Sequence, residues 1–421
     1  MSYERLSRFW KYQPVHQVEN FLHNSQVNYI NGQIKLFGKQ LLQTELPDNL
    51  KWIDIDVNNE FILEVLYLFL KDHYVEDVNG MYRLEYSKEL IKSMLNYPGS
   101  STDLNVGMIY VCPESSKITL IGFISAIIHK IKIIDKIYDV SEINLLCIHK
   151  DLRNKLLAPI MISEITRRVA FKDTQIALYT ISKTITKPLT VCNYYSYYLN
   201  NQKLKECLFI DDNIKPSVTE NLIINNKYKL KYNELYNEMF YNDIELHYNI
   251  KNTSRFQYFS DLNDNTTRNI WILFNKFLKK YKINKVFTLK DCLYYLNNKN
   301  NITNIIKSHD NKIIGIYTIV NINSSILFKN EKDHDKIKSC YLTYYAYDEN
   351  LININDLLKD VCILAKKCDF DMLLCLDIME STDDVLNTVG FQKTNTTLNY
   401  YLYNYIIQNE LKSNDIGVVF F

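Results

Sequence analysis

The stretch LIGFISAI, residues 120–127, has a counterpart in IIGIYTIV, residues 313–320. Each is a short apolar run that contains one glycine and several β-branched residues, a composition that favours a buried strand. Two similar runs so far apart in one chain raise the possibility that their surroundings are repeated as well.

The segments around the two runs do follow the same order. An amphipathic helix is predicted before each run, at residues 58–74 and 266–281, because apolar side chains recur there at three- and four-residue spacing. A second strand and a further helix are predicted after each run, at 142–148 and 158–171 in the first half and at 340–347 and 355–370 in the second. Chance recurrence of helix, strand, strand and helix is the alternative, but we favour an internally duplicated α/β unit.

The break between the repeats is predicted near residues 211–230, where polar turn residues interrupt the periodicity. We therefore expect two domains, residues 1–215 and residues 216–421. The expected fold class is α/β, with two pseudo-symmetric halves around a mixed twisted sheet. Ligands tend to lie where such halves meet.

The composition of the 421 residues is that of a globular protein, with 47% hydrophobic and 23% charged residues. The net charge of +1 gives no basic field that would recruit nucleic acid. No apolar run approaches the roughly 20 residues of a membrane-spanning helix, and the polar residues after Met1 argue against a signal peptide. The nine cysteines form no CxxC pair, which predicts reduced thiols and a cytoplasmic protein. We expect a monomer.

Residues 141–159, SEINLLCIHKDLRNKLLAP, have the pattern of a strand, a basic turn and the start of a helix, with Pro159 in the first helical turn. A helix N-terminus presents free N–H groups and the positive end of the helix dipole to an anion, and Lys150, Arg153 and Lys155 add positive charge. The pattern predicts a site for a pyrophosphate; a solvated basic face is the alternative. No glycine-rich phosphate loop of the GxGxxG or GxxxxGK type occurs. The histidines show no HxxxH spacing, so we expect no metal.

Motifs in this stretch and elsewhere resemble those of N-myristoyltransferases. EINLLCIHK, residues 142–150, is similar to the family signature E-I-N-F-L-C-x-H-K, and RFWKYQPV, residues 8–15, is similar to its F-W-x-x-Q-P-V segment. Further matches, in family order along the whole chain, are YVEDVNGMYR (74–83), LIGFISAI (120–127), VCNYYSYYLN (191–200), FDMLLCLDIME (370–380), LNYYLYN (398–404) and IGVVFF (416–421). The resemblance implies a duplicated acetyltransferase-like fold and transfer of myristate from myristoyl-CoA to the N-terminal glycine of proteins, a step of lipoprotein biosynthesis.

The resemblance also assigns residues to this reaction. The backbone N–H groups of Leu145 and Leu146 would hold the thioester oxygen as it becomes an oxyanion, and a strand bulge would free them from ladder pairing. The carboxylate of Phe421 would take a proton from the glycine amine, and burial would make it more basic. Asn144 and Thr180 would help to orient the amine. The apolar ending IGVVFF is accordingly expected to be buried; an edge strand that merely packs is the alternative.

By the same resemblance, the N-terminal arm and the strand–turn–helix segment hold the acyl-CoA. A closed apolar pocket would set the length of the acyl chain that is accepted. The implied residues are Arg8, Phe9, Trp10, Cys147, Ile148, Arg153, Asn154, Lys155, Leu157, Ala158 and Pro159. Leu156 departs from the pattern, because the R-x-x-G-x-A motif of acyl-CoA folds has glycine there and the transferase family commonly has arginine. One cationic partner of the cofactor is therefore missing.

The peptide groove implied by the resemblance shows further departures. Its residues would be Val75, Asp77, Tyr82, Tyr86, Tyr194 and Tyr344. The acidic run that follows Y-V-E in the family is reduced to Asp77, Ser196 and Leu374 replace the usual His and Asn, and GFQKTNT (390–396) replaces K-F-G-x-G-D-G. Because carboxylates have been lost, we predict weaker selection for a lysine downstream in the peptide.

Three functions stay open at this point. The leading one is a peptide N-myristoyltransferase, an N-acyltransferase that works by direct transfer. The second is a non-catalytic protein that binds acyl-CoA or lipidated peptides, and the third is an acyltransferase of the same fold with another acyl length or a lysine acceptor. We expect His149 to be structural and Cys147 to be a small core residue, since no nucleophile elbow such as GxSxG occurs.

Overall fold

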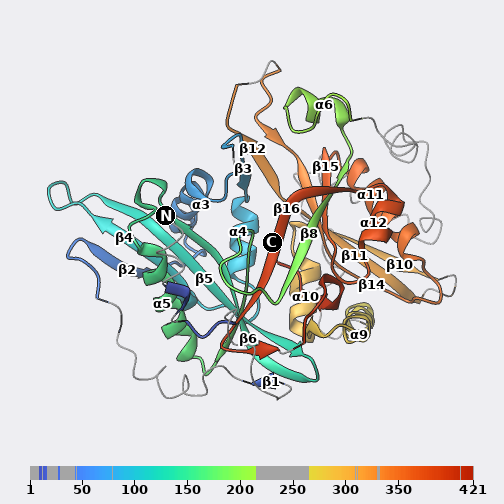
Figure 1. The fold of residues 1–421 in the computed structure, drawn as a ribbon, viewed down its shortest axis with the longest axis horizontal. Coiled ribbons are helices and arrows are strands. Elements are labelled where there is room, and N and C mark those ends of the chain that lie inside the picture. Colours follow the sequence, from blue (N-terminus) through green and yellow to red (C-terminus); the bar gives the residue numbers. More distant parts are fainter. Residues whose placement is uncertain are drawn as a thin grey trace. The chain divides into compact units, whose positions relative to one another are not determined.

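The structure, a computed structural model, describes residues 9–11, 13–16, 27–28, 43, 45–77, 79–214, 265–308, 310, 312–329, 332–407 and 409–420. The chain, drawn in Figure 1, divides into two compact units. Unit 1 comprises Met1–Val75, Tyr86–Val191 and Thr397–Lys412. Unit 2 comprises Glu76–Glu85, Cys192–Thr396 and Ser413–Phe421. The predicted boundary between residues 215 and 216 lies outside the described residues and stays a prediction.

Unit 1 is built around one mixed sheet. Its helices are α3 (Glu60–His73), α4 (Lys88–Leu95) and α5 (Leu157–Ala170), and its strands are β2 (Leu50–Asp54), β4 (Asn105–Val111), β5 (Ile118–Ile133), β6 (Lys136–Ile148) and β7 (Ile176–Ile181). Strands β2, β4, β5 and β6 pair antiparallel in that order, whereas β7 pairs parallel with β6. The end of β16 (Gln392–Tyr403) pairs with β7, and the short strands β1 (Val27–Asn28) and β17 (Ile406–Ile407) pair with each other.

Unit 2 contains a sheet of the same design. Its main elements are α9 (Asn265–Leu278), β9 (Ile283–Lys285), α10 (Leu289–Asn297), β10 (Asn301–Lys307), β11 (Ile313–Asn321), β14 (Ser339–Tyr347), α11 (Ile354–Lys367), β15 (Met372–Leu376) and α12 (Asp383–Val389). Strands β10, β11 and β14 pair antiparallel, and β15 pairs parallel with β14. Strand β8 (Thr190–Tyr198) pairs with β15, and α6 (Asn201–Glu206) follows it. A small sheet joins β3 (Tyr82–Glu85), β12 (Asn323–Ile326) and β13 (Lys336–Ile337).

The predicted duplication is confirmed by this strand order. In each unit two helices precede three antiparallel strands, and one helix then leads to a fourth strand that is parallel to the third. A helix is the usual connection between two parallel neighbouring strands. Even an irregularity is repeated: the register shifts between Phe123 and Ser125 of β5, and between Tyr317 and Ile319 of β11. All eight elements predicted from the two apolar runs and their flanks are present, with bounds that differ by a few residues.

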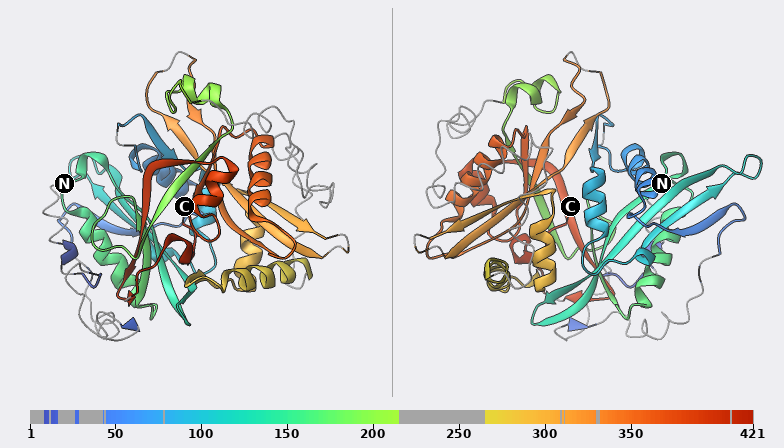
Figure 2. Two further views of the ribbon diagram at one scale, coloured as in Figure 1. Left: turned by 45° about the vertical axis from the view of Figure 1, so that its right-hand side comes forward. Right: turned by 180° about the vertical axis from the view of Figure 1, so that it is seen from behind.

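The core of unit 1 lies between α5 and its sheet. Met161 and Ile165 of α5 are buried against Ile121 and Ile124 of β5. Gly122 permits this close approach, because a Cβ atom there would lie 3.3 Å from the sulfur of Met161. The helix can be followed beside the long β5–β6 ribbon in both views of Figure 2. This packing fixes the N-terminus of α5 relative to the end of β6.

The core of unit 2 is aromatic. All nine residues of β14 are buried, which means that both faces of this strand are covered. Phe277 of α9 packs against Tyr345 and Tyr347 of β14, with ring centres 5.7 and 5.1 Å apart. Much of the high tyrosine content of the chain is thus used for packing.

Three further observations concern the described part of the chain as a whole. No helix in it is long and apolar enough to cross a membrane. The nine cysteines are free thiols, eight of them buried. Among the same residues, no three His, Cys, Asp or Glu side chains are grouped so that they could hold a metal ion.

Candidate functional site

The strand bulge expected at residues 145 and 146 is present in β6. Ser125 pairs with Asn144 and Phe123 pairs with Cys147, so Leu145 and Leu146 together stand opposite one residue of β5. Leu145 has a φ angle of 55°, in the left-handed region that residues other than glycine rarely adopt. The side chain of Leu145 is buried and that of Leu146 is 38% exposed. The bulge therefore takes two consecutive peptide units out of regular register.

Asn144, directly before the bulge, is held by a partly buried acid. Its side-chain N–H donates to Oε1 of Glu142 at 2.8 Å. The other oxygen of Glu142 lies 3.0 Å from Nε2 of His129, whose side chain is almost fully buried. The ring of Tyr97 in turn packs edge-on against His129. These contacts fix the amide of Asn144 in one orientation.

The turn after β6 is tied to the C-terminal end of α3. His73, the last residue of α3, accepts a hydrogen bond at Nδ1 from the N–H of Lys150 at 3.4 Å. The carbonyl oxygen of His73 accepts from the sulfur of Cys147 at 3.3 Å and from the guanidinium of Arg153. Burial raises the pKa of Cys147 to about 12, which makes it a poor nucleophile.

The residues of the predicted anion site lie in one loop of unit 1. Lys150 begins a single 3₁₀ turn (Lys150–Leu152), and the loop continues to Leu156, the residue that precedes α5. Asn154 and Leu156 have positive φ angles of 75° and 63°, so the chain turns sharply before α5. Lys155 lies between them and is exposed. Backbone donors, a helix N-terminus and cationic side chains together fit a phosphate group.

The helix itself starts as predicted. Leu157, Ala158 and Pro159 are its first three residues, so the missing N–H of Pro159 falls where no intrahelical bond would form. Ile148, the last residue of β6, packs against the buried face of this helix. The strand, turn and helix predicted from residues 141–159 are thus confirmed as structure, whereas their cofactor role stays a prediction.

The N-terminal arm packs on unit 1. Trp10 is 7% exposed, and its ring stacks on Tyr179 of β7 at 5.8 Å, with Phe9 edge-on at 5.1 Å. Tyr179 stacks in turn on Tyr401. Thr180, the neighbour of Tyr179 on β7, pairs with Tyr400 of β16. Arg8 lies outside the described residues.

The C-terminal segment is buried in unit 2, as the sequence predicted. Strand β18 (Ile416–Gly417) pairs parallel with β9, and the carbonyl of Ile416 accepts from the N–H of Met379 at 3.1 Å. Val418, Val419 and Phe420 are each less than 5% exposed. Phe421 lies outside the described residues, so its role as a base stays a prediction.

The residues expected to contact the peptide fall into two groups. Val75 and Tyr86 belong to unit 1, where Val75 is exposed and Tyr86 is buried beside Tyr74. The remaining four, Asp77, Tyr82, Tyr194 and Tyr344, belong to unit 2.

The four residues of unit 2 already have partners within that unit. The carboxylate of Asp77 accepts from the N–H groups of Tyr82 at 2.7 Å and Asn79 at 3.0 Å, which closes a turn. The hydroxyl of Tyr82 donates to the carbonyl of Cys207. The ring of Tyr194 packs beside that of Tyr341, with 6.4 Å between their centres, and burial raises the pKa of Tyr194 above its ordinary value. The hydroxyl of Tyr344 accepts from the N–H of Val419 at 3.0 Å.

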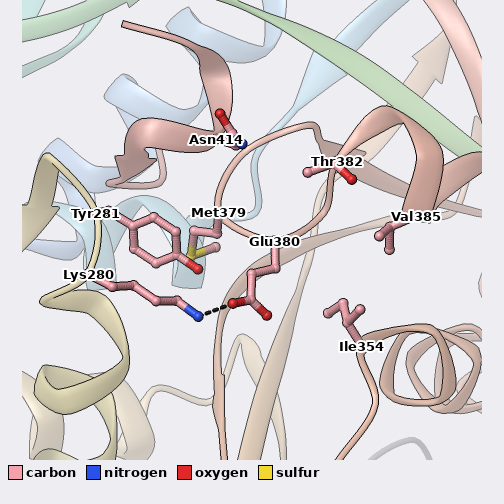
Figure 3. A pocket seen from close by; sticks show the side chains of 8 residues that line it. All are labelled: Lys280, Tyr281, Ile354, Met379, Glu380, Thr382, Val385 and Asn414. Atoms are coloured by element: carbon pink, nitrogen blue, oxygen red, sulfur yellow. Dashed lines mark hydrogen bonds and ion pairs between the residues drawn. The ribbon is translucent and has the colours of Figure 1, made fainter. Parts of the chain in front are cut away.

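A hollow of about 430 Å³ lies elsewhere on unit 2 (Figure 3). Its lining residues are Lys280, Tyr281, Ile354, Met379, Glu380, Thr382, Val385 and Asn414. The ammonium of Lys280 is paired with Glu380, as the dashed line shows (Figure 3). None of the predicted site residues lines this hollow.

Sequence reasoning missed the residues that support the predicted ones. His73 holds the turn, and Glu142 and His129 hold the amide of Asn144, but no motif marks either histidine. Glu142 belongs to the EINLLCIHK signature, which assigns it no supporting role. The sole available signal was its position two residues before Asn144, which places both side chains on the same face of a strand.

Comparisons with known proteins point to one family. Residues 29–192 match the family described as "Myristoyl-CoA:protein N-myristoyltransferase, N-terminal domain", and residues 229–419 match its C-terminal domain. A glycylpeptide N-tetradecanoyltransferase of Dictyostelium discoideum is 31% identical over 416 residues, which cover 98% of this chain and 92% of the relative. A glycylpeptide N-tetradecanoyltransferase 2 of Danio rerio is 28% identical, covering 94% of this chain and 74% of the relative.

The fold is likewise that of a solved transferase. The chain is similar to Saccharomyces cerevisiae N-myristoyltransferase with bound myristoyl-CoA, with a TM-score of 0.79, 25% identity and coverage of 98% of this chain and 94% of that one. The expected acetyltransferase-like fold class is confirmed by this likeness. Since the two domain matches span most of the sequence and the Dictyostelium relative aligns over nearly its whole length, the chain belongs to the myristoyl-CoA:protein N-myristoyltransferase family.

Proposed function

We propose that this protein is an N-acyltransferase that moves myristate from myristoyl-CoA to the N-terminal glycine amine of proteins. The observation that carries the proposal is the family match along nearly the whole chain. The bulge at Leu145 and Leu146 and the buried C-terminal segment support it independently, because both are features that this chemistry needs.

The oxyanion is the first requirement of the reaction. As the glycine nitrogen attacks the thioester carbon, the carbonyl oxygen gains negative charge, and the N–H groups of Leu145 and Leu146 would stabilise it. These are backbone donors, so the leucine at 145 does not remove them. Loss of one such donor would raise the barrier by about 2.7 to 4 kcal/mol. The tetrahedral intermediate then collapses. The oxyanion re-forms the carbonyl group, the carbon–sulfur bond breaks, and CoA leaves as the thiol while the amide remains.

The second requirement is a neutral amine. An α-amino group has a pKa near 7.7 to 8.0, so only about a tenth of it is neutral at pH 7. The Phe421 carboxylate would accept one proton from the glycine ammonium before attack, and the second proton lost from nitrogen balances the departing thiolate. Asn144 and Thr180 would orient the amine. The orientation of Asn144 by Glu142 supports that role.

The third requirement is a grip on the acyl-CoA. Lys150, Arg153, Lys155 and the N-terminus of α5 suit its phosphates. The remaining residues proposed to contact it are Arg8, Phe9, Trp10, Cys147, Ile148, Asn154, Leu157, Ala158 and Pro159. An apolar pocket would select the chain length, since one methylene group is worth about 1 to 3 kcal/mol in such a site.

We propose a division of labour along the chain. Residues 1–215 would bind myristoyl-CoA and residues 216–421 the peptide, with Val75, Asp77, Tyr82, Tyr86, Tyr194 and Tyr344 along the peptide groove. The protein would act as a cytoplasmic monomer without nucleic acid. Its free thiols support the reducing compartment.

Intact-mass measurement of a peptide that begins with glycine, incubated with the protein and myristoyl-CoA, tests the proposal. A gain of one myristoyl group supports it, and the same peptide with an acetylated N-terminus should gain nothing. No change would favour a non-catalytic binder of acyl-CoA or lipidated peptides. Acylation only with other chain lengths, or on lysine, would favour an acyltransferase of altered specificity.

A further inference from the structure

The bulge in the second repeat is the counterpart of the Leu145–Leu146 bulge. On β14, Thr343 and Tyr344 together stand opposite Thr318 of β11, because Tyr345 pairs with Tyr317 and Leu342 pairs with Ile319. The duplication has therefore left the chain with two such bulges. Only the first is assigned a role in acyl transfer.

The main chain at the second bulge is bonded to a side chain of its own unit. The N–H of Tyr344 donates to the hydroxyl oxygen of Tyr295 at 3.4 Å. The Tyr295 hydroxyl also contacts Oγ1 of Thr343, which donates to the carbonyl of Thr318 at 3.1 Å. Since the single proton of Thr343 is used there, Tyr295 is the donor to Thr343. All of these groups are buried, so this bulge does not present its donor to a substrate.

The side chain of Tyr344 is enclosed by aromatic rings. Its ring packs edge-on against Phe287 at 5.1 Å, Tyr295 at 5.8 Å and Phe274 at 6.5 Å, and Tyr344 is only 3% exposed. A ring held on several sides fixes the position of its hydroxyl group. The hydroxyl is thus a rigid acceptor.

This acceptor binds the C-terminal segment. The N–H of Val419 donates to the Tyr344 hydroxyl at 3.0 Å in a buried setting. The ladder pairing of β18 covers only Ile416 and Gly417, so Tyr344 supplies a contact beyond its end. Val419 lies two residues before Phe421 in the sequence. Two peptide bonds join Val419 to the last residue, so the position of Val419 limits where that residue can lie.

We propose that Tyr344 is a positioning residue for the C-terminal carboxylate, and that the second bulge holds this tyrosine in place through Tyr295. The duplicated bulges then have different tasks: the first stabilises the oxyanion and the second supports the base. The effect on turnover rests on the proposed function, because it needs Phe421 as the base. The effect on the C-terminal segment does not.

The variant Tyr344→Phe tests the proposal, since it keeps the ring and removes only the acceptor. We expect backbone hydrogen exchange at Val419, measured on C-terminal fragments, to accelerate at least about tenfold, as loss of one buried hydrogen bond predicts. We also expect kcat to fall about 10- to 100-fold, with the KM for myristoyl-CoA changed less than about twofold. Tyr317→Phe is the matched control, because it removes a buried hydroxyl that accepts from Nδ2 of Asn304 at 2.7 Å in the same sheet.

The two measurements separate the possible failures. Unchanged exchange at Val419 in Tyr344→Phe, or equal acceleration in Tyr317→Phe, would overturn the proposal. Faster exchange with unchanged kcat would overturn the role in turnover and count against Phe421 as the base. If Tyr344→Phe does not fold, Tyr295→Phe removes the group that receives the Tyr344 N–H; a smaller acceleration at Val419 is expected, and none would overturn the proposal.

Discussion

The imidazole rings of His73 and His149 lie against each other, with 3.9 Å between their centres. His73 ends α3 and His149 precedes the basic turn that starts at Lys150. The contact therefore joins a helix end to the loop proposed to hold the phosphates of myristoyl-CoA. Two cations, Lys150 and Arg153, lie beside the pair.

Acidification should weaken the protein through His73. Burial, followed by the nearby His149, Lys150 and Arg153, lowers the pKa of His73 from 6.5 to about 4, against a smaller opposite effect of Asp72. Because the folded state disfavours the protonated form, this stabilising contribution is complete above pH 6.5 and is lost as the pH falls toward about 4. His73→Gln should lose less stability than the parent protein between pH 7.5 and 5 in urea unfolding. Equal losses would contradict the assignment.

Leu156→Gly should stabilise the protein. Leu156 has a φ angle of 63° and is 44% exposed. In this conformation a Cβ atom destabilises the folded state by about 1 to 2 kcal/mol. Glycine avoids that strain, but its greater loss of backbone entropy on folding costs about 0.5 to 1 kcal/mol. We expect the free energy of unfolding in urea to rise by about 0.5 to 1 kcal/mol, and myristoyl-CoA to bind at least as tightly, because the approach to the N-terminus of α5 is widened.

Leu208→Gly is the matched control for this change. Leu208 has a φ angle of 57° and is 65% exposed, but it lies after α6, far in sequence from the phosphate loop. It should raise stability by a similar amount and leave the affinity for myristoyl-CoA unchanged. A loss of stability in Leu156→Gly would show that the leucine makes contacts that outweigh its strain.

Glu142→Leu should impair both folding and turnover. It leaves His129 and Asn144 without their shared acceptor, and an unsatisfied buried polar group costs about 1 to 3 kcal/mol. We expect a lower kcat at unchanged KM for myristoyl-CoA, because Asn144 loses its fixed orientation. Asp139→Ala removes an ion pair with Lys130 on the same two strands, where both side chains are about half exposed, and should cost less than about 1 kcal/mol. Equal effects of the two changes would contradict the role given to Glu142.

Peptide selection should depend little on a downstream lysine. The one acidic residue left at the predicted position, Asp77, already accepts hydrogen bonds from Tyr82 and Asn79. We expect kcat/KM for Lys and Ala variants of one glycine-starting peptide to differ by less than about fivefold, as for an exposed ion pair worth at most about 1 kcal/mol. A strong preference for lysine would mean that carboxylates from elsewhere in the chain reach the peptide.

The repeated parts of the fold could be predicted because the spacing of apolar residues shows which face of a helix or strand is buried. Both apolar runs and their flanking helices follow directly from residue spacing, as β5 and β11 show. The supporting contacts could not be predicted. His73 and Lys150, or Tyr344 and Val419, are far apart in sequence, and only the folded chain brings them together.

The sequence also does not show that a segment of the first repeat belongs to unit 2. Residues 76–85 fall within the first repeat, yet β3 pairs with β12 in unit 2. The sequence of β3 is compatible with pairing at the edge of either sheet. Which strand it pairs with depends on contacts distant in sequence, and the local residue pattern does not specify them.

The central claim is that the Phe421 carboxylate accepts the proton of the attacking glycine. The most direct test is the single-turnover rate of a variant with one alanine added after Phe421, measured with bound myristoyl-CoA and a saturating glycine peptide. Since a general base contributes about 10²- to 10⁴-fold, the account predicts a fall of at least about 100-fold with unchanged binding of myristoyl-CoA. A variant that turns over at the parent rate would contradict it.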